Sequence, residues 1–296
     1  MIWQPKVTYQ LRGPRLPFLR NVESVSTAKK AKQADATPAF SLVSSSPPST
    51  ASLIVLTGNS AGTASIDGGQ AEYVRVPHAN QTLVKTPSEV RESLLVLMGD
   101  IFPTGYFAAS RFLKSLTPSE AKETTVAVVG CGPVGICAIA TALTWCERVF
   151  AIDLVPDRLE EARKLGAIPI SLENDPAAKI KEATSGRGAD VALEVVGSPE
   201  SLSLCLDIVR PFGSVSSVGV QTSTLALDGP SVYNKNLTIA WGRCPVRGIF
   251  DDALACLAKV QDQVAFLCER TVPLEDAVKA YKLFNDRKVH KLLLKP

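Results

Sequence analysis

Three glycines, Gly130, Gly132 and Gly135, are the residues of this chain whose spacing points most clearly to chemistry. A valine-rich run precedes them, and an uncharged helical pattern follows. The first glycine allows a tight turn, the second lets a phosphate approach the backbone, and the third lets helix and strand pack closely. Free N–H groups at a helix start attract anions. The pattern predicts a dinucleotide-binding strand–helix–strand unit, although glycine pairs also occur in turns without a ligand. The predicted phosphate contacts are Gly130, Gly132, Pro133, Val134 and Gly135.

An acidic residue, Asp153, closes the next apolar run, eighteen residues beyond the third glycine. A carboxylate at this distance accepts hydrogen bonds from the adenosine ribose hydroxyls and repels a 2′-phosphate. Asp153 therefore favours NAD over NADP, with a solvated residue at a strand end as the simpler alternative. Arg158, five residues later, is expected to flank the adenosine or to form an ion pair on its own helix.

The composition limits the other classes of function. The chain has 296 residues and a formal net charge of +3, too mild to indicate a nucleic-acid partner. Its seven cysteines form no CxxC pair and lie in apolar surroundings, so we expect buried free thiols in a reducing compartment. Only two histidines, His78 and His290, are present, which limits any histidine-based mechanism.

One uncharged stretch, residues 126–145, is long enough to span a bilayer. Glycine and proline residues within it argue against one continuous helix, and buried parallel strands also read as unbroken apolar runs. We therefore expect no membrane partner and a cytoplasmic location. Residues 1–52 are basic and rich in serine, with no helical or strand period, so we expect them to be disordered or poorly folded. This composition leaves organelle targeting open.

From residue 124 onward, strand and helix patterns alternate, which predicts an α/β fold with a doubly wound parallel sheet. The strands are expected at 126–129, 149–152, 168–171, 189–197, 214–219 and 237–241, and the helices at 157–165, after 175–176, and at 199–209. Outside this unit we expect strands at 52–56 and 70–77, helices at 90–98, 250–260 and 274–285, and a last strand at 291–294.

Several separated strings resemble the zinc-type alcohol dehydrogenases of the medium-chain dehydrogenase/reductase superfamily. They are GGQAEYVRVP at 68–77, GDIFPTGY at 99–106, VVGCGPVG at 128–135, ADVALEVVG at 189–197 and the closing residues 291–296. The resemblance covers roughly residues 59–296 in the family's order. The second string looks most like the formaldehyde and polyol dehydrogenase branch.

The resemblance implies two domains and a role for several residues. It implies a Rossmann NAD-binding domain at 106–246 and a partial GroES-like, β-rich catalytic domain at 53–105 and 247–296, after a non-family segment at 1–52. Thr104 matches a position that packs on the nicotinamide, with a helix-cap threonine as the alternative. Val218 and Gly219 match positions that offer backbone groups to the carboxamide. Lys291 matches a phosphate-contacting cation, although an exposed lysine is the simpler expectation, and Glu194 is expected to be structural.

The sequence departs from this family at the catalytic zinc. Members carry a cysteine ligand and a Gly-His-Glu motif upstream, whereas this chain has no cysteine before Cys131 and no histidine before His78. Asp100 alone matches a ligand position, and one carboxylate does not hold zinc firmly, so we expect the metal not to be retained. A misread or truncated start at residues 1–52 would explain this departure.

Three functions remain open on these grounds. The first is an NAD-dependent alcohol or polyol dehydrogenase with impaired turnover, acting on a small alcohol or aldehyde. The second is a zinc-independent reductase of the quinone-reductase type, which Asp153 disfavours because such enzymes prefer NADPH. The third is a non-catalytic NAD-binding protein. The resemblance also implies a homo-oligomer.

Overall fold

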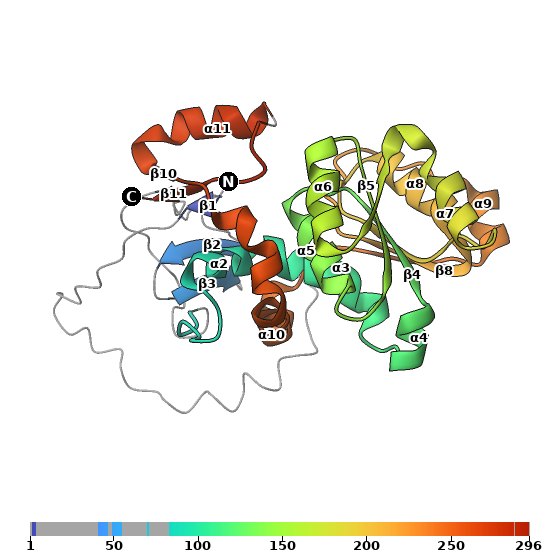
Figure 1. The fold of residues 1–296 in the computed structure, drawn as a ribbon, viewed down its shortest axis with the longest axis horizontal. Helices are drawn as coiled ribbons and strands as arrows, with labels where there is room; N and C mark the ends of the chain where they lie inside the picture. Colours follow the sequence, from blue (N-terminus) through green and yellow to red (C-terminus); the bar gives the residue numbers. More distant parts are fainter. Residues whose placement is uncertain are drawn as a thin grey trace.

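The computed structural model describes residues 2–3, 41–46, 49–54, 70, 83–286 and 288–295. Its main feature is a six-stranded, fully parallel sheet with the order β6-β5-β4-β7-β8-β9 (Figure 1). The strands are β4 (Thr125–Val129), β5 (Arg148–Asp153), β6 (Ile168–Ser171), β7 (Ala189–Glu194), β8 (Val209–Ser217) and β9 (Thr238–Trp241). The chain runs outward from β4 to β6, returns to β7 beside β4, and runs outward again to β9. This is the doubly wound α/β fold that the alternating pattern predicts.

Helices cover both faces of the sheet, because alternate residues of its strands point to opposite sides. Val126 and Val128 of β4 belong to one buried cluster, and Ala127 and Val129 belong to another. The first cluster includes α3 (Ile101–Leu113), α5 (Pro133–Ala142) and α10 (Val246–Val264), and the second includes α7 (Pro176–Ala183) and α8 (Pro199–Ile208).

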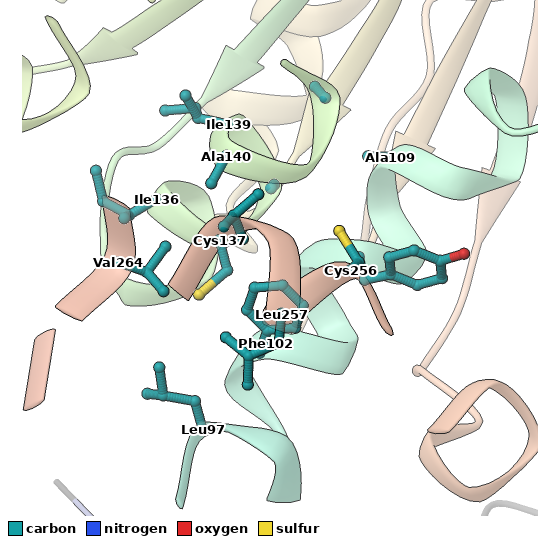
Figure 2. Close-up of a cluster of buried hydrophobic side chains, with 14 of the residues drawn as sticks. Leu97, Phe102, Ala109, Ile136, Cys137, Ile139, Ala140, Cys256, Leu257 and Val264 are labelled. Carbon is teal, nitrogen blue, oxygen red and sulfur yellow. The ribbon is translucent and has the colours of Figure 1, made fainter. Parts of the chain in front are cut away.

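The first cluster is dense where three helices meet. Phe102 of α3, Cys137 of α5 and Leu257 of α10 are all fully buried and lie close together (Figure 2). All seven cysteines are buried free thiols, as expected. The uncharged stretch at 126–145 is divided between β4 and α5. In the part of the chain that the structure describes, no single helix is long and apolar enough to cross a membrane, although one bent pair passes by length and composition.

Local signals set the helix ends in this unit. Helix α6 (Pro156–Leu165) begins at its proline and ends before Gly166, whose φ of 103° is left-handed. Proline fits the first helical turn, and glycine adopts a left-handed cap without steric cost. The sequence prediction for this helix is confirmed. Two short helices were not expected, α4 (Pro118–Glu123) and α9 (Gly229–Lys235).

The remaining elements lie beside this unit (Figure 1). A parallel three-stranded sheet joins β1 (Ile2–Trp3), β11 (Leu293–Lys295) and β10 (Thr271–Pro273), and β2 (Ser41–Ser46) pairs antiparallel with β3 (Ser49–Ile54). The others are α2 (Glu92–Leu95), η2 (Val96–Gly99), η3 (Leu172–Asn174), η4 (Ala265–Cys268), η5 (Leu274–Asp276) and α11 (Ala277–Asn285).

Some of the predicted elements outside the parallel sheet match the structure, and others differ from it or lie outside the described residues. The helices expected at 250–260 and 274–285 correspond to α10 and to η5 with α11, whereas β10 was not expected. Strands β1, β2 and most of β3 lie within residues 1–52, where no strand period was found. The strand expected at 70–77 lies outside the described residues, apart from Gln70. The domain boundary at 105/106 falls within α3, and the domain division stays a prediction.

Candidate functional site

The carboxyl edge of the sheet collects the residues that the sequence singled out. Strand β4 lies between β5 and β7, and the chain turns in opposite directions from these two neighbours. In open α/β sheets, ligands bind in the crevice outside the carboxyl ends of the strands at such a switch point. The glycine motif follows β4, Asp153 ends β5, and Val218 and Gly219 follow β8.

The three glycines differ in their surroundings. Gly130 has a φ of 101°, and a Cβ on it would lie 2.6 Å from Val196 Cγ2. A Cβ on Gly135 would lie 1.9 Å from the Gly130 carbonyl oxygen, so the loop and the helix are in direct contact there. Among the described residues, a Cβ on Gly132 would meet nothing within 4 Å. The middle glycine therefore faces open space, and it is the N-cap of α5 with no side-chain cap.

The Asp153 carboxylate is held between the ends of β4 and β5. Its Oδ2 accepts a hydrogen bond from Cys131 N at 2.7 Å, and its Oδ1 accepts one from Val155 N at 2.9 Å. Arg158 Nη1 lies 3.8 Å from Oδ2, and the Asp153 side chain is only 8% exposed. The alternative of a solvated aspartate is therefore wrong. Arg158 forms the ion pair with Asp153 itself.

Three exposed apolar side chains border this edge. Leu154 follows β5, Val196 follows β7 and Val220 follows the end of β8, with exposures of 55%, 54% and 69%. The loops that carry the last two residues touch, because a Cβ on Gly219 would lie 2.2 Å from Gly197 N. Exposed apolar residues on the loops of this edge are suited to contact with a flat, partly apolar ligand.

The backbone N–H groups of Val218 and Gly219 both donate hydrogen bonds within the protein. Val218 N and Gly219 N donate to the Glu194 carbonyl oxygen at 3.0 and 3.3 Å. The backbone groups that this segment can still offer to a ligand are therefore its carbonyl oxygens. Glu194 itself is fully buried at the end of β7, in agreement with the expected structural residue.

A second group of residues lies at the start of α3. Asp100 is the N-cap of this helix, and Thr104 Oγ1 donates to Asp100 Oδ1 at 2.7 Å. Thr104 is thus not the helix cap. Cys244, which follows β9, forms a hydrogen bond with Thr104, and burial with the nearby Asp100 charge raises the pKa of this thiol to about 12. Sequence reasoning missed Cys244, although its place after a parallel strand puts it at the same edge.

Arg111, also missed, ties α3 to the sheet. Its guanidinium donates to the carbonyl oxygens of Ser217, Ala240 and Gly242 at 3.3, 2.9 and 3.2 Å. It also lies 3.9 Å from the centroid of the Phe107 ring. Burial lowers the pKa of Arg111. These contacts fix the helix that carries Asp100 and Thr104 against the ends of β8 and β9.

Lys291 contradicts the expectation of an exposed lysine. It is only 3% exposed, and its buried Nζ has no hydrogen-bond partner in the part of the chain that the structure describes. Burial lowers the pKa of Lys291 to about 8, opposed by the nearby Cys268, Cys137 and Asp100. Lys291 lies near Cys137 of α5 and Cys268 of η4, a long-range proximity that the local sequence does not reveal. Burying a charged group is costly unless it is paired.

The described residues do not assemble a zinc site. Among them, no group of three or more histidine, cysteine, aspartate or glutamate side chains could hold a metal ion. A catalytic zinc takes three protein ligands and an open position. His290 lies elsewhere, with Nδ1 2.5 Å from Glu161 Oε2 on α6, and His78 lies outside the described residues.

Known proteins resemble this chain in both sequence and structure. The zinc-binding dehydrogenase family matches residues 133–259. The alcohol dehydrogenase TADH from Thermus sp. ATN1 superposes with a TM-score of 0.71 at 35% identity, covering 78% of this chain and 68% of that chain. The chain belongs to the zinc-type alcohol dehydrogenase family, within the medium-chain dehydrogenase/reductase superfamily.

Two curated relatives match this family assignment. Zinc-type alcohol dehydrogenase B from Aspergillus flavus is 47% identical over 234 residues, 78% of this chain and 55% of its own length. A medium chain reductase/dehydrogenase from an Acremonium species is 46% identical over 176 residues, 58% of this chain and 60% of its own length. The chain therefore spans a little over half the length of these relatives.

Proposed function

We propose that this zinc-type alcohol dehydrogenase-like chain binds NAD(H) across the carboxyl edge of its parallel sheet. The observation that carries the proposal is the glycine loop with its aspartate. Gly132 faces open space between two closely packed glycines, and Asp153 is fixed 2.7 Å from Cys131 N. The residues present therefore fit a dinucleotide. When bound, its nicotinamide would supply the hydride acceptor or donor.

Each part of the coenzyme has a partner on this edge. The pyrophosphate would lie at Gly132 and the start of α5, with Lys291 Nζ, which has no partner among the described residues, as its cation. Asp153 would hold the adenosine ribose and Arg158 would flank it. The exposed Leu154 and Val196 would cover the adenine. A phosphate beside Lys291 would stabilise the charged ammonium that burial disfavours.

The nicotinamide half would meet the loop after β8 and the start of α3. The N–H groups of Val218 and Gly219 donate to Glu194. The carbonyl oxygens of these two residues would accept hydrogen bonds from the carboxamide. Thr104, held by Asp100, would orient the ring. These residues bind and orient, and none of them by itself polarises an alcohol oxygen.

We further propose that oxidation of an alcohol or polyol by this chain is impaired. Asp100 stands at the matching ligand position, but the described residues bring no second and third ligand to it. A Lewis acid contributes several kcal/mol to such a reaction, and about 1.4 kcal/mol corresponds to a tenfold change in rate. The same observation favours the second candidate, a non-catalytic NAD-binding protein of this family. By resemblance we also propose a GroES-like catalytic part and a homo-oligomer, and from the buried free thiols a cytoplasmic location.

The experiment that tests this function is a titration of the purified chain with NADH and NADPH, followed by coenzyme fluorescence. We expect saturable NADH binding and weaker NADPH binding. Asp153→Asn should reduce this preference, because it removes the charge that repels a 2′-phosphate. NADPH binding tighter than NADH binding would overturn the assignment in favour of the zinc-independent reductase. No binding of either coenzyme would reject the function altogether.

A further inference from the structure

Glu194 is a buried carboxylate placed between the two loops at the switch point. It is the last residue of β7, where it is paired in register with Val129 of β4 and with Ser217 of β8. Its side chain is fully buried. A buried carboxylate is tolerated only when hydrogen bonds satisfy it, so its partners indicate which segments it holds.

Five donors converge on this carboxylate from both sides. Oε1 accepts from Val196 N at 2.8 Å, Gly197 N at 2.7 Å and Ser201 Oγ at 2.7 Å. These donors belong to the loop after β7 and to α8. Oε2 accepts from Ser217 Oγ at 2.7 Å and Gln221 Nε2 at 3.3 Å, which belong to the end of β8 and the loop after it.

The backbone of the same residue completes the connection. The Glu194 carbonyl oxygen accepts from the N–H groups of Val218 and Gly219. The two loops are in contact at their glycines, since a Cβ on Gly219 would lie 2.2 Å from Gly197 N and 2.7 Å from Glu194 Oε2. One residue therefore fixes the separation and orientation of both loops.

We propose that Glu194 is a positioning residue for the nicotinamide half of the coenzyme. This inference rests on the proposed NAD(H) function. Hydrogen bonds to an ionised carboxylate are stronger than neutral ones, so loss of the charge loosens both loops together. The loop after β8 carries Val218 and Gly219, whereas the phosphate loop at Gly132 makes no hydrogen bond to Glu194 among the described contacts. Removing a Glu194 partner on the β8 side should affect nicotinamide binding far more than ADP binding.

Two serines offer a matched pair of variants. Ser217 and Ser201 are both buried, and each donates to Glu194 at 2.7 Å, but from opposite sides of the carboxylate. Dissociation constants for NADH and for ADP-ribose, which lacks the nicotinamide, are measured by calorimetry for each variant. We expect Ser217→Ala to raise the dissociation constant for NADH about tenfold and that for ADP-ribose less than about twofold. Ser201→Ala should leave the ratio of the two constants as in the wild type. Glu194→Gln should shift this ratio in the same direction as Ser217→Ala, and further.

The outcomes separate this inference from the function on which it rests. Wild-type protein that binds neither NADH nor ADP-ribose overturns both. Wild-type protein that binds both ligands, with equal ratios in Ser217→Ala and Ser201→Ala, overturns the positioning role alone. The ratio is insensitive to a general loss of stability, and the serine pair supplies the answer even if Glu194→Gln does not fold.

Discussion

Two regions of the protein, the carboxyl edge of the sheet and the start of α3, differ in how many of the residues expected for their predicted ligands they contain. At the edge proposed for the coenzyme, Gly132 faces open space among the described residues, and Asp153 Oδ2 accepts a hydrogen bond from Cys131 N. At α3, Asp100 has Thr104 and Cys244 nearby but no set of metal ligands among the described residues. A nucleotide site built from one short loop and its neighbouring strand ends can stand alone. A zinc centre needs ligands from distant segments, so it is lost when any one of them is missing.

The largest expected effect comes from Gly135→Ala. Its Cβ would lie 1.9 Å from the Gly130 carbonyl oxygen, so the loop or the helix must move. We expect the free energy of unfolding to fall by about 3 kcal/mol or more, because the obstacle is backbone. Thermal unfolding followed by circular dichroism measures this. Gly132→Ala is the control, since its Cβ meets nothing within 4 Å in the described part of the chain.

The control variant sharpens the comparison further. Gly132→Ala should change the free energy of unfolding by less than about 1 kcal/mol, the usual cost of an altered N-cap. The variant should still weaken NADH binding, because the methyl group occupies the space proposed for the pyrophosphate. A Gly132→Ala protein that binds NADH normally would place the coenzyme elsewhere.

The next effect concerns Lys291 and depends on pH. Its folded-state pKa of about 8 lies below its ordinary value of 10.5. Protons are therefore bound more tightly in the unfolded chain, and this residue destabilises the fold below pH 8 by about 3 kcal/mol. The penalty decreases as the pH rises from about 8 and is absent above about 10.5. Lys291→Met should thus stabilise the free protein at pH 7 and lose this advantage at pH 10.5.

Chemical denaturation at both pH values measures this effect, with Lys295→Met as the control because Lys295 is exposed. Lys291→Met should also weaken NADH binding if the Lys291 ammonium contacts the pyrophosphate. An equal change in stability at pH 7 and pH 10.5 would show that the ammonium is not desolvated as the structure indicates. That result would remove the reason for placing the Lys291 ammonium at the edge proposed for the coenzyme.

The smallest effect lies nearer the start of β8, at the fourth residue of the strand. Phe212 has a φ of 58° and is 73% exposed. A left-handed conformation costs a residue with a Cβ about 1 kcal/mol, and glycine avoids this cost. Phe212→Gly should raise the free energy of unfolding by about 1 kcal/mol, whereas Phe212→Ala should not, since alanine keeps the strain. Coenzyme affinity should stay unchanged in both variants. Altered NADH binding would mean that this position and the carboxyl end of the strand are coupled.

The sequence predicted what depends on neighbours in the chain. The parallel sheet, the helix between Pro156 and Gly166, and the glycine motif with Asp153 all follow from local pattern and spacing. The burial of Lys291 and the contact of Cys244 with Thr104 depend on segments far apart in the chain. Glu194 was placed correctly at a strand end. Its five donors come partly from the loop after β8, and no local pattern indicates that contact.

The most direct test of a coenzyme site without a metal centre is an NADH titration of the purified chain before and after EDTA treatment, with the zinc content measured on the same samples. We expect saturable NADH binding, unchanged by EDTA, in protein with far less than stoichiometric zinc. Absence of NADH binding, or stoichiometric zinc whose removal abolishes that binding, would show that the chain has no coenzyme site independent of a metal centre.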